Sequence, residues 1–330
     1  MYTELVKIIE GGLANDKEKV INFAIVLANN LERQGETSLA NKIRSTLTRK
    51  TGTLTALDSF ATKPVDNESR MDILEITSPQ ISPNQVILSK YSQEAVTNFI
   101  ESYKHRDSLQ ELGLGTNNSL LLYGPPGCGK TTVAQFISSM TGLPLVTARL
   151  DGLVSSLLGS TAKNIRKVFD YASNRECILF LDEFDVIAKL RDDKNELGEL
   201  KRVVNSLIQN IDEFSEDSIL IAATNHHKLL DPAVWRRFNF VVALEKPQLE
   251  EVNLLLLNIL EGKETNFLSN PKKFNLVVNA LYGLSHADIK TIVTNALRSA
   301  VLSEEKCLTN YQVLKETFFH LNHSVEDEDH

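Results

Sequence analysis

The 330-residue sequence has three cysteines and no long apolar run, and each shortage excludes a class of protein. Cys128, Cys177 and Cys307 are an odd number, stand far apart and form no C-x-x-C pair, which argues against a disulfide scaffold or a zinc cluster. No apolar stretch reaches the length of about 18 residues that a membrane span requires, and no basic segment precedes an apolar one at the N-terminus. We therefore expect a protein of the reducing cytoplasm without a membrane partner.

An excess of positive charge is also missing. Lys and Arg number 35 against 43 for Asp and Glu, which gives a net charge of −8, and no helix clusters Lys and Arg. Nucleic acid is thus an unlikely partner, although a local basic channel stays possible. Hydrophobic residues make up 42% and charged residues 24%, as in an ordinary globular protein rather than a disordered one.

The chain divides by pattern into five parts. Residues 1–50 carry apolar positions at helical spacing and predict an N-terminal helical region, too small to bury much core, which we expect to recruit a substrate or partner. Residues 51–84 are rich in Ser, Thr and Pro and predict a linker, part of which could lie along the next domain. Residues 85–243 predict an α/β domain, 244–323 a helical region, and 324–330 an acidic tail.

The α/β prediction depends on five short apolar runs separated by helical stretches. They are rich in Ile, Val and Leu and show no polar alternation, which is typical of strands buried on both faces of a parallel sheet. The runs span 120–123, 145–147, 178–181, 219–222 and 240–243. A three-layer parallel sheet follows, and after Pro247 the pattern turns helical, with Ser285 and Asp288 as a capping box.

A glycine-rich loop follows the first of these runs and matches the phosphate-binding pattern G-x-x-x-x-G-K-[ST]. The loop comprises Gly124, Pro125, Pro126, Gly127, Cys128, Gly129, Lys130 and Thr131, and Thr132 follows it. Its glycines let backbone N–H groups face phosphate oxygens, Lys130 supplies a positive charge, and Thr131 offers a hydroxyl to Mg²⁺. The plain alternative is a Gly-Pro turn; Cys128 is interpreted as a small filler, since no base accompanies it.

Two strand ends carry further polar residues. The run at 178–181 ends in Asp182 and Glu183, which predicts Mg²⁺ binding by Asp182 and activation of the attacking water by Glu183. The run at 219–222 leads to Asn225, whose amide can contact both the γ-phosphate and that water. Asp185 is interpreted as a helix-start residue, and His226 and His227 as surface residues.

Arg236 and Arg237 stand together just before the last run. Guanidinium groups suit phosphate, but this pair follows a strand beside the one that carries the loop and is poorly placed for its own nucleotide. We therefore expect the pair to act on a neighbouring subunit. The alternative is a salt-bridged surface pair.

In this order, GPPGCGKT, ILFLDEFD, AATN, LDPAVWRRF and GLSHADIK resemble the AAA family of AAA+ ATPases over residues ~85–322. The resemblance implies a five-stranded parallel sheet with a helical lid, a six-membered ring, and ATP with Mg²⁺ as cofactors. It assigns Gly124–Thr131 to Walker A, Asp182 and Glu183 to Walker B, Asn225 to sensor 1, and the arginines to fingers acting in trans.

The same resemblance extends to the lid and to the loop after the second strand. Ala287 matches the lid residue near adenine, and His286 stands where the family usually has glycine; Val86 and Ile87 could flank the adenine or simply pack. Leu157 and Leu158 align with the first pore loop, where many members have an aromatic residue; ordinary helix core is the alternative. Short bacterial members of this kind are often encoded beside a subtilisin-like serine protease, some in phage-defence pairs, which implies a possible protease partner.

Four functions stay open on the sequence alone. The first is an ATP-driven remodeller of a protein substrate, in which the pore loop moves against a bound chain. The second is a regulatory switch that gates a partner without threading, which the missing pore aromatic keeps open. The third is an ATPase that handles nucleic acid, and the fourth an inactive phosphate-loop protein.

Overall fold

The computed structural model describes two compact units, Met1–Thr62 and Lys63–His330. The described residues are 73–114, 118–150, 158–185, 197–214, 218–226, 232–305 and 307–328, with the single positions 7, 23, 24, 26, 27, 64, 228 and 230. For residue 84 and for 158–160, 197–202 and 323–328, only the backbone is described. The domain boundaries expected from the sequence stay predictions.

Most of the first unit lies outside the described residues. Positions 7, 23, 24, 26 and 27 are helical. Ala24 and Leu27 are buried while Val26 is 43% exposed, as the apolar spacing of the predicted helix requires. The recruiting role expected of residues 1–50 stays a prediction.

The second unit is built around a six-stranded sheet in the order β1-β3-β4-β5-β2-β6. The strands are β1 (Glu75–Thr77), β2 (Ser119–Tyr123), β3 (Leu145–Arg149), β4 (Ile178–Asp182), β5 (Ile219–Thr224) and β6 (Phe240–Ala243). The five strands β2 to β6 pair in parallel, which confirms the predicted parallel sheet. The residues of β2, β4 and β5 are almost all buried, as expected for strands covered on both faces.

The sheet has one strand more than predicted. β1 comes from the segment interpreted as a linker and pairs antiparallel with the edge strand β3. A three-residue strand among Thr, Ser and Pro gives no alternation to detect, and its pairing depends on the exposed edge that β3 offers. The 3-10 turn Pro83–Gln85 follows it.

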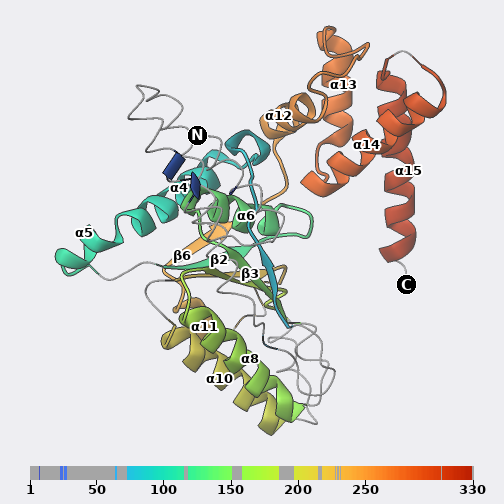
Figure 1. Ribbon diagram of the computed structural model, residues 1–330. Coiled ribbons are helices and arrows are strands. Elements are labelled where there is room, and N and C mark those ends of the chain that lie inside the picture. The colour runs from blue at the N-terminus through green and yellow to red at the C-terminus, as the bar shows by residue number, and fades with distance from the viewer. Residues whose placement is uncertain are drawn as a thin grey trace. The chain divides into compact units, whose positions relative to one another are not determined.

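Helices cover both faces of the sheet (Figure 1). α4 (Lys90–Lys104) and α6 (Lys130–Thr141) lie on one face, and α8 (Leu158–Ser173) and α10 (Leu197–Asp212) lie on the other. Two shorter helices complete the domain, α5 (Arg106–Glu111) and α11 (Pro232–Trp235). This is the expected three-layer α/β domain.

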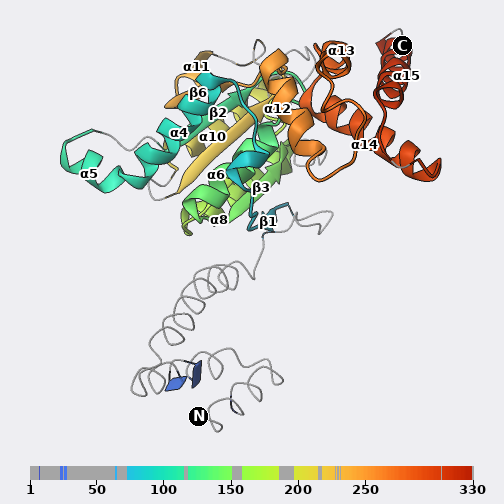
Figure 2. The same cartoon turned by 90° about the horizontal axis from the view of Figure 1, so that it is seen from above.

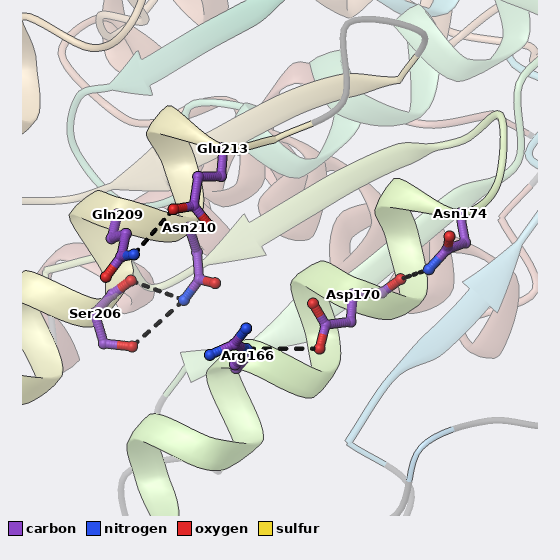
Figure 3. A network of polar contacts seen from close by, with 7 residues as sticks. All are labelled: Arg166, Asp170, Asn174, Ser206, Gln209, Asn210 and Glu213. Carbon is purple, nitrogen blue, oxygen red and sulfur yellow. Dashed lines mark hydrogen bonds and ion pairs between the residues drawn. The ribbon is translucent and has the colours of Figure 1, made fainter.

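α8 and α10 pack side by side and turn polar faces outward (Figure 3). Their surface side chains bond one turn along their own helix: Asn174 to the Asp170 carbonyl at 2.6 Å, and Gln209 to Glu213 at 2.9 Å. Each such contact contributes a few tenths of a kcal/mol, about 0.2–0.5, to an isolated helix. The pair is therefore held mainly by its apolar faces.

Four helices form the lid: α12 (Leu249–Ile259), α13 (Pro271–Leu281), α14 (His286–Leu302) and α15 (Asn310–Glu328), grouped in Figure 2. They enclose a core of their own that includes the fully buried Phe267. Ser285 caps α14 through the predicted capping box with Asp288. α15 continues as helix into the segment expected to be an acidic tail.

Candidate nucleotide-binding site

Three parallel strands end at one edge of the sheet and bring the predicted site residues together. Tyr123 at the end of β2 is opposite Thr224 at the end of β5, and Leu181 on β4 is opposite Ala222. The glycine-rich loop, Asp182 and Asn225 therefore emerge side by side. Ligands of open α/β sheets bind at this edge, where strand order changes direction.

The glycine-rich loop needs glycine at two positions for identifiable reasons. Gly124 has φ 147°, and a Cβ there would lie 2.0 Å from the backbone oxygen of Leu244. Gly127 has φ 74°, and a Cβ there would lie 2.4 Å from Ser285 Oγ of the lid. The loop thus packs closely against the residue that follows β6 on one side and against the lid on the other.

Lys130 closes the loop on itself. Its Nζ donates to the carbonyl oxygens of Gly124 at 2.7 Å and Pro125 at 2.8 Å. Burial lowers the pKa of the Lys130 ammonium, while Cys128 and Asp182 act in the opposite direction. The ammonium therefore lies in a partly desolvated position beside the loop, where an incoming anion would interact strongly with it.

Cys128 is buried within the loop, and burial raises the pKa of its thiol despite the opposing charge of Lys130. A neutral buried thiol is a poor nucleophile. This agrees with its interpretation as a small filler.

Thr131 and Asp182 supply the oxygen atoms expected of a Mg²⁺ site. Thr131 Oγ1, at the start of α6, donates a hydrogen bond to Asp182 Oδ2, at the end of β4, with a distance of 3.4 Å. A hydroxyl and one carboxylate, completed by phosphate oxygens and water, suit the way proteins hold Mg²⁺ beside nucleotides. The residues present therefore fit the metal.

Glu183 stands in an unusual backbone conformation. Its φ is 55°, its N–H donates to Asp182 Oδ1 at 3.0 Å, and its side chain lines the cavity described below. Non-glycine residues with positive φ are uncommon and gather at functional sites. Because of this backbone conformation, the side chain of Glu183 leaves the chain in a different direction from that of its neighbour Asp182.

Asp185 lies in a turn and is buried. Its interpretation as a helix-start residue stays a prediction, because the residues that follow it lie outside the described part of the chain. Asp185 Oδ1 accepts the backbone N–H of Asn225 at 3.3 Å and the hydroxyl of Thr224 at 3.4 Å. Asp185 therefore fixes the end of β5, from which Asn225 projects.

A cavity of about 490 Å³, here called the loop cavity, joins these residues to the lid. It is lined by Gln85, Val86, Ile87, Leu88, Pro126, Gly127, Cys128, Gly129, Lys130, Thr131, Thr132, Val133, Asp182, Glu183, Asn225, Leu255, His286, Ala287 and Lys290. The predicted adenine neighbours Val86, Ile87 and Ala287 are among them. Ala287 also donates its backbone N–H to the Gly127 carbonyl at 3.0 Å, so the lid touches the loop directly.

Two predicted site residues, Gly124 and Pro125, do not line the loop cavity. Their carbonyl oxygens accept hydrogen bonds from Lys130 Nζ instead. Arg236 and Arg237 do not line the cavity either. Arg236 is exposed, whereas Arg237 Nε lies 2.8 Å from Asp212 Oδ1 and its guanidinium also donates to the Ala233 carbonyl. The two arginines that the sequence treats alike are thus in different environments.

The pore loop cannot be placed. Leu157 lies outside the described residues, and Leu158 is described only as the backbone that begins α8. His226 is exposed, in agreement with its interpretation as a surface residue, while His227 lies outside the described residues.

The sequence analysis missed Lys290 and the role of Asp185. Lys290 is four residues after His286 and so lies on the same face of α14. This spacing could have predicted its place at the cavity once the helix was assigned. No sequence pattern indicates the role of Asp185, because its hydrogen-bond partners lie at the end of β5, far away in the sequence.

The comparisons with known proteins concern the family of the chain. Residues 120–246 match the family described as ATPase family associated with various cellular activities (AAA). An uncharacterized AAA family ATPase, y4kL of Sinorhizobium fredii, is 36% identical over 263 residues, which are 79% of this chain and 75% of that protein. The chain belongs to the AAA family of ATPases. It is therefore an ATP hydrolase.

Two further relatives of this AAA ATPase are longer than it. ATP-dependent zinc metalloprotease FtsH of Helicobacter felis is 27% identical over 248 residues, 72% of this chain and 38% of that protein. Proteasome-activating nucleotidase 1 of Haloferax volcanii is 29% identical over 251 residues, 71% of this chain and 60% of that protein. The chain thus spans less than two thirds of both. In its described part, no helix is long and apolar enough to cross a membrane.

Proposed function

We propose that this AAA ATPase couples ATP hydrolysis to the remodelling or unfolding of a protein substrate. The observation that carries the proposal is the loop cavity, where the groups suited to phosphate chemistry meet the start of the lid helix α14. Since Ala287 bonds directly to the loop, whatever fills the cavity acts on the lid as well. One relative is named as an ATP-dependent zinc metalloprotease and another as a proteasome-activating nucleotidase, which supports a protein substrate.

In the proposed reaction, the loop N–H groups and Lys130 bind the triphosphate. Lys130 exchanges its two carbonyl partners, Gly124 and Pro125, for phosphate oxygens. Glu183 orients the attacking water and takes its proton, and Asn225 contacts both that water and the γ-phosphate. When bound, Mg²⁺ neutralises charge on the phosphates, and Thr131 and Asp182 would hold it.

The position of Arg236 and Arg237 supports an oligomer in which active sites are shared between subunits. Because neither lines the cavity of its own chain, we propose that the exposed Arg236 reaches the nucleotide of a neighbour in a ring of AAA subunits, as the sequence resemblance implies. Apolar side chains exposed on the lid, among them Val301 and Tyr311, offer surface for such a neighbour. A six-membered ring is the arrangement we propose.

Leu157 and Leu158 would grip the substrate as pore-loop residues. A serine protease that receives the unfolded chain within a defence system is the partner that the sequence resemblance favours. The second candidate function is a regulatory switch without threading, which the leucine in place of an aromatic residue favours.

The test uses Glu183→Gln, which should bind ATP but hydrolyse it very slowly and so retain its substrate. The Glu183→Gln protein is purified in the presence of ATP, with Lys130→Ala as the control. Size analysis would identify the assembly, and mass spectrometry of the chains that co-purify with Glu183→Gln but not with Lys130→Ala would identify what it holds. If Leu157→Ala with Leu158→Ala abolishes unfolding of that substrate while ATP hydrolysis persists, threading is supported. A nucleic acid in the trapped complex, with no protein substrate, would contradict the proposal.

A further inference from the structure

Residues 78–88, here called the strap, connect β1 to the N-cap of α4 and pass the loop cavity on the way. The last four residues of the strap, Gln85 to Leu88, line that cavity. Most of the strap belongs to the segment whose composition predicts a linker. Whatever holds the strap therefore also fixes part of the cavity wall.

The middle of the strap is bonded to α6 through a single side chain. The Ile81 N–H donates to Ser139 Oγ at 3.2 Å, and the Ser139 hydroxyl donates to the Ile81 carbonyl oxygen at 3.1 Å. One hydroxyl can make both bonds, because it has one donor hydrogen and two acceptor lone pairs. Ser139 thus clamps the backbone of a residue that lies 58 positions away in the sequence.

Within the described residues, the other hydrogen bonds of the strap are local and stiffen it. The Ser82 N–H donates to Gln85 Oε1 at 3.2 Å, and the Gln85 N–H donates to the Ser82 carbonyl at 2.9 Å. The Val86 N–H donates to the carbonyl of Pro83, which also fixes its own φ. A shift of Ile81 is therefore carried along to Val86 rather than absorbed between them.

The far end of the strap is anchored separately. Ser89 Oγ caps α4 by accepting the Ser92 N–H at 3.2 Å, and Ser92 Oγ donates to the last carbonyl of β6 at 2.8 Å. The half-buried Val86 and Leu88 pack against the core of the α/β domain. This part of the cavity wall is thus a short span between two holds, one at Ile81 and one at the start of α4.

The helix that carries Ser139 also carries groups proposed to bind phosphate and Mg²⁺. α6 begins at Lys130, and both Lys130 and Thr131 line the loop cavity. Ser139 follows nine residues further along the same helix, about 14 Å at the usual helical rise. The clamp therefore fixes the strap relative to the helix whose first turn faces the cavity.

We propose that Ser139 is a positioning residue for ATP, which clamps Ile81 and so holds Gln85–Leu88 in place as a wall of the loop cavity. The inference rests on the proposed nucleotide site. Without the clamp, the strap would have to be ordered each time a nucleotide binds, which costs conformational entropy. A wall that is held in advance favours the ground state and the transition state alike, so it affects binding rather than the chemical step.

The test is steady-state ATP hydrolysis by Ser139→Ala, with equilibrium binding of ATP and inorganic tripolyphosphate to the same variant in the Glu183→Gln background. KM for ATP should rise, and ATP affinity should fall, by about three- to tenfold, as the loss of one or two hydrogen bonds implies. kcat should stay nearly unchanged. Tripolyphosphate lacks the part of the nucleotide that would reach the strap, so its affinity should not change.

Three measurements accompany Ser139→Ala. Ser139→Thr keeps the hydroxyl and should behave as the wild type. Thr141→Ala removes a hydroxyl of the same helix that bonds to the Ile137 carbonyl of α6 at 2.8 Å, and it should change neither KM nor kcat. Amide hydrogen exchange at Ile81 should quicken in Ser139→Ala but not in Thr141→Ala.

An unchanged KM in Ser139→Ala would overturn the inference, because the clamp would then not hold the wall. Equal losses of affinity for ATP and tripolyphosphate would also overturn it, since the effect would pass through α6 and the glycine-rich loop. So would a Ser139→Thr variant as impaired as Ser139→Ala. If the wild-type protein fails to bind ATP, the proposed nucleotide site fails instead.

Discussion

Asp182, Glu183 and Asp185 are three carboxylates within four residues, yet the backbone gives each a different partner. Asp182 is bonded to Thr131, Glu183 lines the loop cavity, and Asp185 turns back to the end of β5. Glu183 has a positive φ of 55° between them. One residue's conformation thus accompanies the separation of the proposed metal ligand, the proposed water-activating residue and the positioning residue.

Asp185→Ala should lower kcat by about tenfold and leave KM for ATP nearly unchanged, because Asn225 loses the acceptor that fixes its backbone N–H. Asp185→Asn keeps an oxygen acceptor and should retain most of the activity. Steady-state ATP hydrolysis, with thermal unfolding of both variants, checks this. An Asn variant as inactive as the Ala variant would show that the charge of Asp185 matters rather than its hydrogen bond.

At the residue scale, the sequence predicted whatever is local. The loop from Gly124 to Thr131, with Asp182 and Glu183 at a strand end, is readable because consecutive residues specify it. The role of Asp185 was not readable, because it depends on Asn225, which approaches only through the fold. The same holds for the ion pair of Arg237 with Asp212.

At the element scale, the start of α14 is held from two sides. Ser285 Oγ accepts the Asp288 N–H at 3.2 Å, and the Ala287 N–H is donated to Gly127 of the loop at 3.0 Å. Asp288 in turn lies 3.3 Å from His320 of α15. The first turn of α14 therefore links the loop to the rest of the lid.

Ser285→Ala should weaken this turn by about 1 kcal/mol, the usual cost of losing an N-cap side chain. Amide hydrogen exchange at Asp288 and Ala287 should then quicken by about fivefold, since both amides need the turn to form. Thr294→Ala, which removes a hydroxyl from an exposed position in the middle of α14, should leave these rates unchanged. Equal protection in Ser285→Ala and the control would contradict the importance of the cap.

Elements with a strong periodic or apolar pattern were predictable, and one defined by its neighbours was not. β2, β4 and β5 are strands of five or six residues that consist mostly of apolar residues, and their type follows from this composition. β1 has only three residues, and it is a strand because β3 offers it an edge. Its antiparallel direction could not be read from the segment itself.

At the scale of the whole molecule, the arginine-bearing segment packs against the end of β2 and against the turn that follows β4. Trp235 packs edge-on against Tyr123, the last residue of β2, with ring centroids 5.5 Å apart. Phe238 packs in the same way against Phe184, which follows Glu183, at 6.1 Å. Arg236 lies between these two anchors in the chain. In the proposed ring, a change at one chain's nucleotide would therefore move the group presented to the next chain.

Arg236 and Arg237 should consequently differ. Arg236→Ala should abolish hydrolysis in a pure assembly, because each nucleotide loses the arginine of its neighbour. Mixed one to one with Glu183→Gln, it should recover about a quarter of wild-type turnover, the fraction of sites that pair an intact Glu183 with a neighbour's intact Arg236 across a head-to-tail interface. ATP hydrolysis measured across mixing ratios gives the result.

Asp212→Asn serves as the matched control for this mixing experiment, since it removes the partner of Arg237 and leaves Arg236 untouched. It should keep most of the wild-type turnover in a pure assembly, because an exposed ion pair is worth about 0–1 kcal/mol. If instead Asp212→Asn is as inactive as Arg236→Ala, the positioning of Arg237 is indispensable. If no mixing ratio restores turnover, the active sites are not shared between chains, because only a shared site can combine the glutamate of one subunit with the arginine of another.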